Sequence, residues 1–270
     1  MPKPCVFCGS TATLTNAHVL SQPIRAAFLD PSVTGSLVFR QSRQADGSDA
    51  AHSHSGSWVD VKAKAECARC NGGWSRQIEE SVSGVLPKLI RGQRMQLSVT
   101  DQEALASWSV VTVLLLQHTH NRAARLVVPA SDYADVYKAK SPTALMKVFT
   151  GYLEPPGQGG PVESSAEYLA EDRSMADIAR LLESDGLPPP ADMRAFTATL
   201  RLGFFVVHVL RVGSPHFIER VSPAGPALSP CLQTIWPTHY AITWPPRSLA
   251  VIGGLIALAR SIDNTGTAVV

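Results

Sequence analysis

Apolar residues recur at steps of three and four residues after position 70, which places them along one face of a helix. The series starts at Trp74 and ends at Ile90, so we expect a helix from about Asn71 to Arg91. Before it, Trp58 to Lys62 alternates apolar and polar residues, as a half-buried strand does. Residues 42–57 contain mainly Gln, Ser, Asp, Gly, Ala and His and have almost nothing to bury, so they predict a mobile insertion.

A second pattern, from Ala104 to Thr119, is apolar and carries no charge. At about 16 residues it is shorter than the ~20 needed to span a bilayer, so we expect a buried core helix and no membrane partner. Thr100 to Glu103 has the form of a capping box that would start this helix. Periodicity and turn residues predict further helices at 24–29, 131–140, 175–183 and 248–262, and further strands at 123–128, 146–153, 194–212 (two strands joined at Gly203), 235–236 and 242–244.

These elements indicate an α+β protein, with one region at residues 1–92 and a larger one, of unknown role, at 93–270. The chain is 45% hydrophobic, and its 24 Lys and Arg exceed its 22 Asp and Glu by a net charge of only +2. Because this charge gives no general attraction for polyanions, a nucleic-acid contact needs a local patch. A modest basic margin is offered by residues that are equally ordinary surface positions: Lys62, Lys64, Arg69 and Arg76.

The cysteines form two close pairs, Cys5-Val-Phe-Cys8 and Cys67-Ala-Arg-Cys70. Each CxxC turn presents two thiolates to one ion, and two turns complete the tetrahedral four-sulfur shell that Zn²⁺ favours. We therefore expect a structural zinc, closed to substrate. A redox dithiol would need a βαβ context, which the pattern does not predict. The leftover Cys231 is most simply a buried small side chain. Paired thiols and the lack of a signal-peptide pattern favour a reducing cytoplasm.

The residues around these pairs resemble the HNH endonucleases, and more narrowly a phage and actinobacterial HNH-like group. The resemblance covers about residues 5 to 80 and rests on three motifs: Cys5-Val-Phe-Cys8-Gly9, Leu14-Thr15-Asn16-Ala17-His18-Val19, and Cys67-Ala-Arg-Cys70-Asn71-Gly72-Gly73-Trp74 followed by Ile78-Glu79. It implies a zinc-braced ββα-metal fold, also called a His-Me finger, at the N-terminus. It also implies an endonuclease that hydrolyses DNA phosphodiester bonds.

In that family the histidine at the end of the first strand is the general base that takes a proton from water. The resemblance assigns this role to His18, whose imidazole is a suitable base near neutral pH. Asn71 would supply an oxygen ligand or orient the phosphate. Both residues would lie at a catalytic divalent cation, Mg²⁺ or Mn²⁺, that bridges the scissile phosphate and the leaving oxygen. Glu79 would either reach back to this site or pair with a basic residue.

The chain also departs from the family pattern. Many HNH proteins carry an acidic metal ligand directly before the base histidine, where this chain has Ala17, and some have a second histidine where it has Ser75. His52 and His54, in the predicted insertion, are alternative ligands or simply solvated. Asn71 could cap the helix, and His18 could only brace the zinc knuckle. An alternative function is therefore a zinc-binding module that no longer cleaves and binds nucleic acid or a protein.

Overall fold

The computed structural model of this chain describes residues 3–28, 37–39, 54–56, 61–119, 128–153, 167–174, 194–213, 215, 218 and 232–246. Its helical segments are α1 (Gln22–Phe28), α2 (Ala68–Cys70), the π-helical turn η3 (Asn71–Ser75), α3 (Arg76–Val82), α4 (Leu86–Ile90), α5 (Val99–Leu116) and α6 (Ala130–Ala139). Within the described ranges, no helix is both long and apolar enough to cross a membrane. The strand predicted at 123–128 lies outside these ranges except for Val128, and so do the helices predicted at 175–183 and 248–262, His52 and Cys231.

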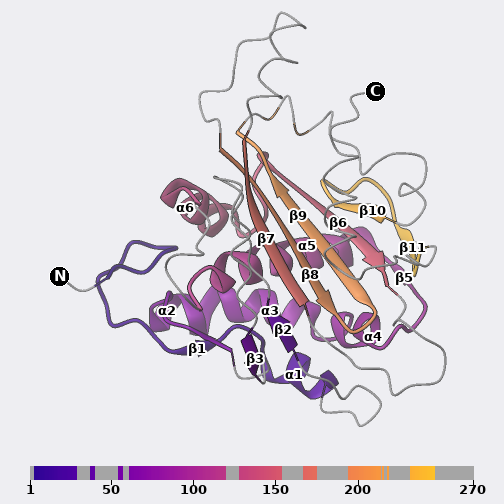
Figure 1. Cartoon of the computed structure of the whole chain (residues 1–270), viewed down its shortest axis with the longest axis horizontal. Coiled ribbons are helices and arrows are strands. Elements are labelled where there is room, and N and C mark those ends of the chain that lie inside the picture. Colours follow the sequence, from indigo (N-terminus) through magenta and orange to yellow (C-terminus); the bar gives the residue numbers. More distant parts are fainter. Residues whose placement is uncertain are drawn as a thin grey trace, which may run out of the picture.

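A seven-stranded sheet forms one layer of the fold, confirming the mixed α+β class (Figure 1). Its strands run in the order β10 (Leu232–Trp236), β6 (Met146–Tyr152), β9 (Phe205–Arg211), β8 (Arg194–Leu202), β7 (Glu167–Ser174), β2 (Leu37–Phe39) and β3 (His54–Gly56). All neighbours are antiparallel except β2 and β7. Two further antiparallel pairs lie outside this sheet: β1 (Ala17–His18) with β4 (Lys62–Ala63), and β5 (Met95–Leu97) with β11 (Ile242–Trp244).

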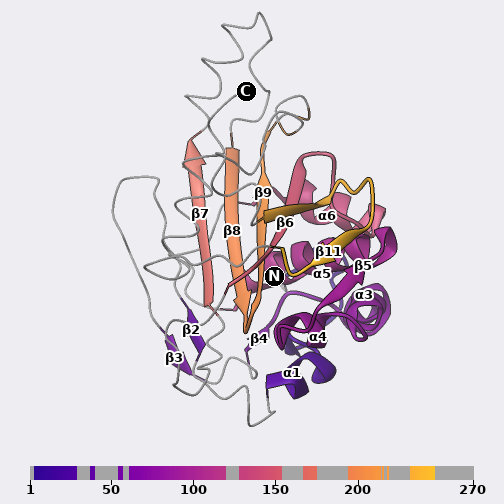
Figure 2. The same cartoon turned by 90° about the vertical axis from the view of Figure 1, so that its right-hand side faces the viewer.

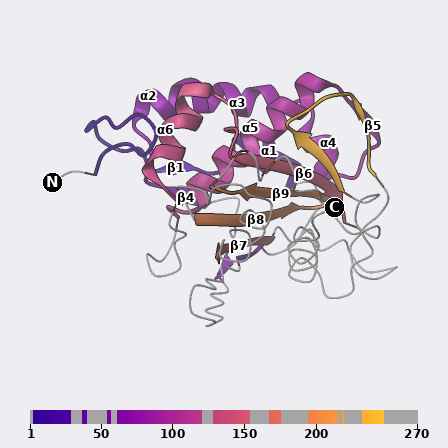
Figure 3. The same cartoon turned by 90° about the horizontal axis from the view of Figure 1, so that it is seen from above.

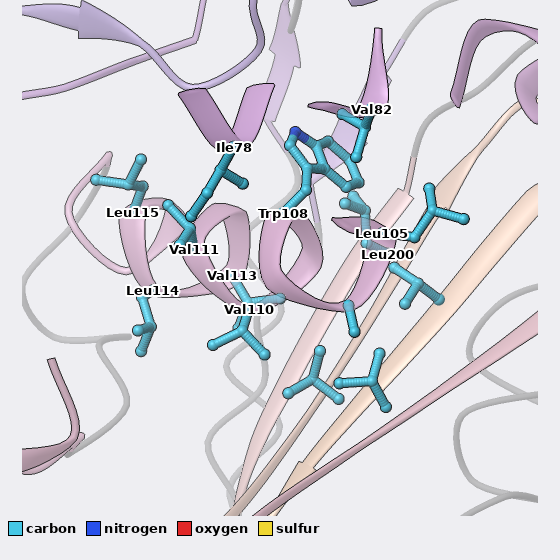
Figure 4. Close-up of a cluster of buried hydrophobic side chains, with 14 of the residues drawn as sticks. Ile78, Val82, Leu105, Trp108, Val110, Val111, Val113, Leu114, Leu115 and Leu200 are labelled. Atoms are coloured by element: carbon cyan, nitrogen blue, oxygen red, sulfur yellow. The ribbon is translucent and has the colours of Figure 1, made fainter. Parts of the chain in front are cut away.

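Helix α5 lies between the sheet and helix α3, and the prediction of a buried core helix is confirmed (Figures 2 and 3). Every side chain from Leu105 to Leu116 is buried. Trp108 and its neighbours meet Ile78 and Val82 of α3 on one side, and Leu200 of β8 lies on the other (Figure 4). A helix that is apolar on all faces is stable in water only when it is covered on all faces. Its polar Ser107 and Ser109 are satisfied because their hydroxyls donate to backbone carbonyls four residues earlier.

The buried hydrophobic cluster continues without interruption from the cysteine pairs to Trp244. It therefore crosses position 92, where the sequence suggested a division, and that division stays a prediction. A buried ion pair reinforces the connection between the layers. Arg211 of β9 donates from Nε to Oδ2 of Asp132 in α6 at 2.8 Å and from Nη2 to Oδ1 at 3.2 Å.

The structure corrects several local predictions. The helix expected from Asn71 to Arg91 is not continuous, because the chain leaves the helical path after Val82 and resumes it at Leu86. Gly84 lies in this interruption, and Pro87 lies in the first turn of the helix that follows, where its missing N–H is harmless.

The cap of α5 also differs from its prediction. Ser98, not Thr100, is the N-cap of α5. Its hydroxyl accepts a hydrogen bond from the backbone N–H of Asp101, and the Asp101 carboxylate accepts one from the backbone N–H of Ser98.

The prediction of a mobile insertion at residues 42–57 is wrong near its C-terminal end, since His54–Gly56 forms β3 and pairs with β2. Residues 57–60 lie outside the described ranges, and the strand expected at 58–62 is seen only at Lys62–Ala63.

Candidate metal centre

Two backbone turns bring the paired cysteines together. The sulfur atoms of Cys5, Cys8, Cys67 and Cys70 all lie within 4.8 Å of one another, and no disulfide joins them. The Cys8 and Cys67 sulfurs are 3.6 Å apart. A tetrahedral zinc with Zn–S bonds of ~2.3 Å would set its sulfurs about 3.8 Å apart. The cluster thus has the donor set and the size that a structural zinc ion requires.

Both turns are closed by backbone hydrogen bonds. In the first, the Gly9 N–H donates to the Cys5 carbonyl at 2.9 Å, and Gly9 has a φ of +70°, which a glycine adopts without strain. In the second, the N–H groups of Cys70 and Asn71 both donate to the Cys67 carbonyl at 3.0 Å. Between the turns, the backbone around residues 14–19 pairs with that around 61–67, so the two knuckles lie at one end of a short ladder.

The surroundings of the thiols favour a bound cation. Burial raises the pKa of Cys5 and of Cys70, so these thiolates would be costly without a compensating positive charge. Burial acts the same way on Cys8, but hydrogen bonds from the Ser10 backbone and from the other thiols outweigh it and lower the pKa of Cys8 to about 6. A metal ion would supply the missing charge to all four sulfurs, because metal binding and thiol ionisation are coupled.

Two cations flank the cluster. The Arg69 guanidinium hydrogen bonds to Cys8, which raises the pKa of Arg69. Burial lowers the pKa of Lys140, while the nearby charges of Cys70 and Cys8 act to raise it. Four thiolates around Zn²⁺ would leave a net negative charge, which Arg69 and Lys140 are placed to offset.

An aromatic cluster, formed by Phe7, Trp74, Tyr133 and Tyr137, joins the metal centre to helix α6. Trp74 packs edge-on against Phe7 at 5.0 Å and against Tyr137 at 5.5 Å between ring centroids, and Phe7 contacts Tyr133 at 5.7 Å. The contact between Trp74 and Tyr137 thus packs α6 against η3, the turn that follows α2. The buried Trp74 indole N–H has no oxygen or nitrogen acceptor. Its interaction with the Cys70 sulfur acts to lower the pKa of Cys70, because it stabilises the thiolate form. A metal-bound sulfur is a natural acceptor for that N–H.

The structure places His18 and Asn71 on different elements of this frame. His18 ends β1, is half-buried and pairs with Lys62 of β4. Asn71 follows Cys70 directly and is half-buried. Its backbone angles are helical and it lies within the helical run, so it does not cap the start of a helix. A metal site needs three or more His, Cys, Asp or Glu side chains whose ligand atoms lie close together. Among the described residues, the four cysteines form such a group, and His18 is part of none.

A buried carboxyl group beside the second knuckle was not found by sequence reasoning. Glu66 is 2% exposed, and burial raises its pKa to about 7 against the opposing effect of a hydrogen bond from Ser75. Glu79 behaves similarly, because burial and then the charge of Glu66 raise its pKa to about 7. Strand alternation from exposed Lys62 and Lys64 would put position 66 on the solvent side, so the local pattern gives no signal for its burial.

No family model, curated protein or solved structure matches this chain. The chemistry of the centre therefore has to be inferred from its own residues. Four sulfurs close the coordination shell of a zinc ion, so this ion would brace the frame and activate no water.

Proposed function

We propose that this protein is an endonuclease of the HNH type, with a structural zinc at the four cysteines, acting on DNA phosphodiester bonds with Mg²⁺ or Mn²⁺. The observation that carries the proposal is the order of elements around the cysteine cluster. Along the chain come a knuckle, then a strand that ends in His18 and, after α1, β2 and β3, its partner strand β4, a second knuckle and a helical run. This is the order that a zinc-braced ββα-metal fold requires.

In this mechanism the neutral imidazole of His18 takes a proton from water, which then attacks the scissile phosphorus. The half-buried position of His18 at the end of β1 leaves its ring within reach of solvent. Asn71 would orient the phosphate or bind the cation through its side-chain oxygen. A bound Mg²⁺ or Mn²⁺ would offset negative charge on the phosphate and the leaving oxygen. His18 and Asn71 include no carboxylate, so water molecules and phosphate oxygens of the DNA would complete the coordination of this cation.

Cleavage of supercoiled plasmid tests the proposal. The wild-type chain should nick plasmid with Mg²⁺ or Mn²⁺ and not with EDTA, and His18→Ala should lose at least about a hundredfold in rate, the usual contribution of a general base. His239→Ala is the matched control, because His239 is exposed in the turn between β10 and β11. Equal cutting by the wild type and by His18→Ala would refute the assignment of the base.

The alternative function is a zinc-braced module that binds nucleic acid or a protein and does not cleave. Two observations favour it: Ala17 stands where an acidic ligand is expected, and His18 belongs to none of the metal-binding groups in the described residues. Binding of a labelled DNA duplex without any nicking, with either cation, would support the module over the enzyme.

A further inference from the structure

The short β1–β4 ladder places a lysine directly beside His18. In this antiparallel pair His18 lies opposite Lys62, and Ala17 lies opposite Ala63. Side chains of directly opposed residues lie on the same face, with Cβ atoms roughly 4.5–5.5 Å apart. Ala63 is buried and Ala17 is half-buried, so the alanine pair lies on the core side of the ladder. His18, also half-buried, and Lys62 lie on the other side. Lys62 is exposed.

The same face continues as a row of positive charge. Lys64 is exposed two residues after Lys62, while Ala63 and Ala65 between and after them are buried. The acidic residue of this stretch, Glu66, is buried. A chain with a net charge of only +2 therefore presents a local cationic strip that begins at His18.

We propose that Lys62 is a positioning residue that binds a backbone phosphate of duplex DNA and holds the strand against His18. This inference rests on the proposed function, because it assigns the substrate contact of the same site. The ammonium group suits the task, since it is a compact charge on a flexible stem and carries three donors for phosphate oxygens. Such a contact carries no sequence information, so the strip would position DNA without selecting a sequence.

An ordinary structural explanation competes with this proposal. Lysines on the exposed face of a two-stranded sheet also prevent edge-to-edge association. The two roles differ in what they do to salt dependence. A phosphate contact releases counterions, so its loss lowers the slope of log affinity against log salt by about 1, whereas an edge lysine contributes nothing to that slope.

The experiment uses the full chain and a short fluorescent DNA duplex, titrated at several salt concentrations. Lys62→Met keeps the aliphatic stem and should lower affinity at low salt by about fivefold and the salt slope by about 1. Lys62→Arg should restore most of both. The control is Lys88→Met, an exposed lysine on α4, which Figure 1 shows well apart from β1. In plasmid nicking, Lys62→Met should raise KM more than it lowers kcat.

The failures of the two proposals are distinguishable. An unchanged salt slope in Lys62→Met, with nicking that still depends on His18, overturns the role of Lys62 and leaves the nuclease intact. Duplex binding that loses slope in Lys62→Met, without nicking by the wild type, supports the phosphate contact and refutes the enzyme. A wild-type chain that binds no duplex overturns both.

Discussion

The ion pair between Asp132 and Arg211 allows a sharp test of how the two layers are held together. The two groups form a bidentate pair, and the side chains are only 5% and 2% exposed. Asp132→Asn keeps the volume and removes the charge, so the buried Arg211 guanidinium loses this counter-charge. Breaking a buried pair in this way typically costs about 3–5 kcal/mol. That is a large part of the ~5–15 kcal/mol by which a folded domain is stable.

A double-mutant cycle of the wild type, Asp132→Leu, Arg211→Met and the double variant separates the cost of breaking this pair from the worth of the pair. Asp132→Leu with Arg211→Met removes both charges, and apolar groups of similar volume often match a buried pair in stability. We expect the unfolding free energy of the double variant to lie within about 2 kcal/mol of the wild-type value. This loss is much smaller than the sum of the losses in the two single variants. The coupling energy of this cycle would then be strongly favourable.

Urea unfolding followed by tryptophan fluorescence measures the four proteins of this cycle and Asp132→Asn, since the chain has 5 Trp. Asp135→Asn is the matched control in the same helix. Asp135 pairs with Lys138 at 3.4 Å, with side chains 53% and 74% exposed, so its loss should cost below about 1 kcal/mol. The reasoning is refuted if Asp132→Asn costs no more than this control, or if the double variant loses the full sum of the single ones.

Three other perturbations have defined outcomes. Cys70→Ser, or a strong chelator, should release zinc to a colorimetric indicator and lower the melting temperature, because metal binding here is coupled to folding; a chain purified without zinc and unaffected by chelator would contradict this. Gly203→Ala should cost at least about 2 kcal/mol, because φ is +58° and an added Cβ would clash with the Ile90 carbonyl oxygen. Gly84→Ala is the control and should be nearly neutral, because a Cβ there meets open space; equal effects would be evidence against the clash. The folded-state pKa of Glu79 is raised from 4.5 to about 7, so its contribution to stability is complete below pH 4.5 and is lost as the pH rises to about 7. Glu79→Gln should therefore flatten the fall in unfolding free energy across this window, and an unchanged pH profile would show that Glu79 is not the group responsible.

Local signals predicted those parts of the structure that depend on local rules. The charge-free run at 104–119 indicated α5, and Gly203 between two apolar runs indicated the β8–β9 hairpin, where a positive φ is required. The cysteine spacing predicted the cluster because a CxxC turn determines its own geometry.

Other features depend on long-range packing, which a single sequence does not display. Both Ser98 and Thr100 begin a capping-box pattern, and the choice between them follows from β5, which ends at Leu97 and pairs with β11 nearly 150 residues later. The position of β2 and β3 at the edge of the large sheet likewise rests on pairing with a distant strand. Glu66 is buried against its local pattern, so only tertiary structure identifies it.

The position of α5 has a practical consequence for engineering this protein. A fragment ending near residue 92 would keep the cysteines, His18 and Asn71 but would leave Ile78 and Val82 facing water, because their partners are on α5. The remaining fragment would expose the other side of the same contact, including Trp108. Each piece would be prone to aggregate. The cysteine frame is thus a poor candidate for grafting onto another protein as an exchangeable cassette, and fusion designs should carry α5 and the sheet with it.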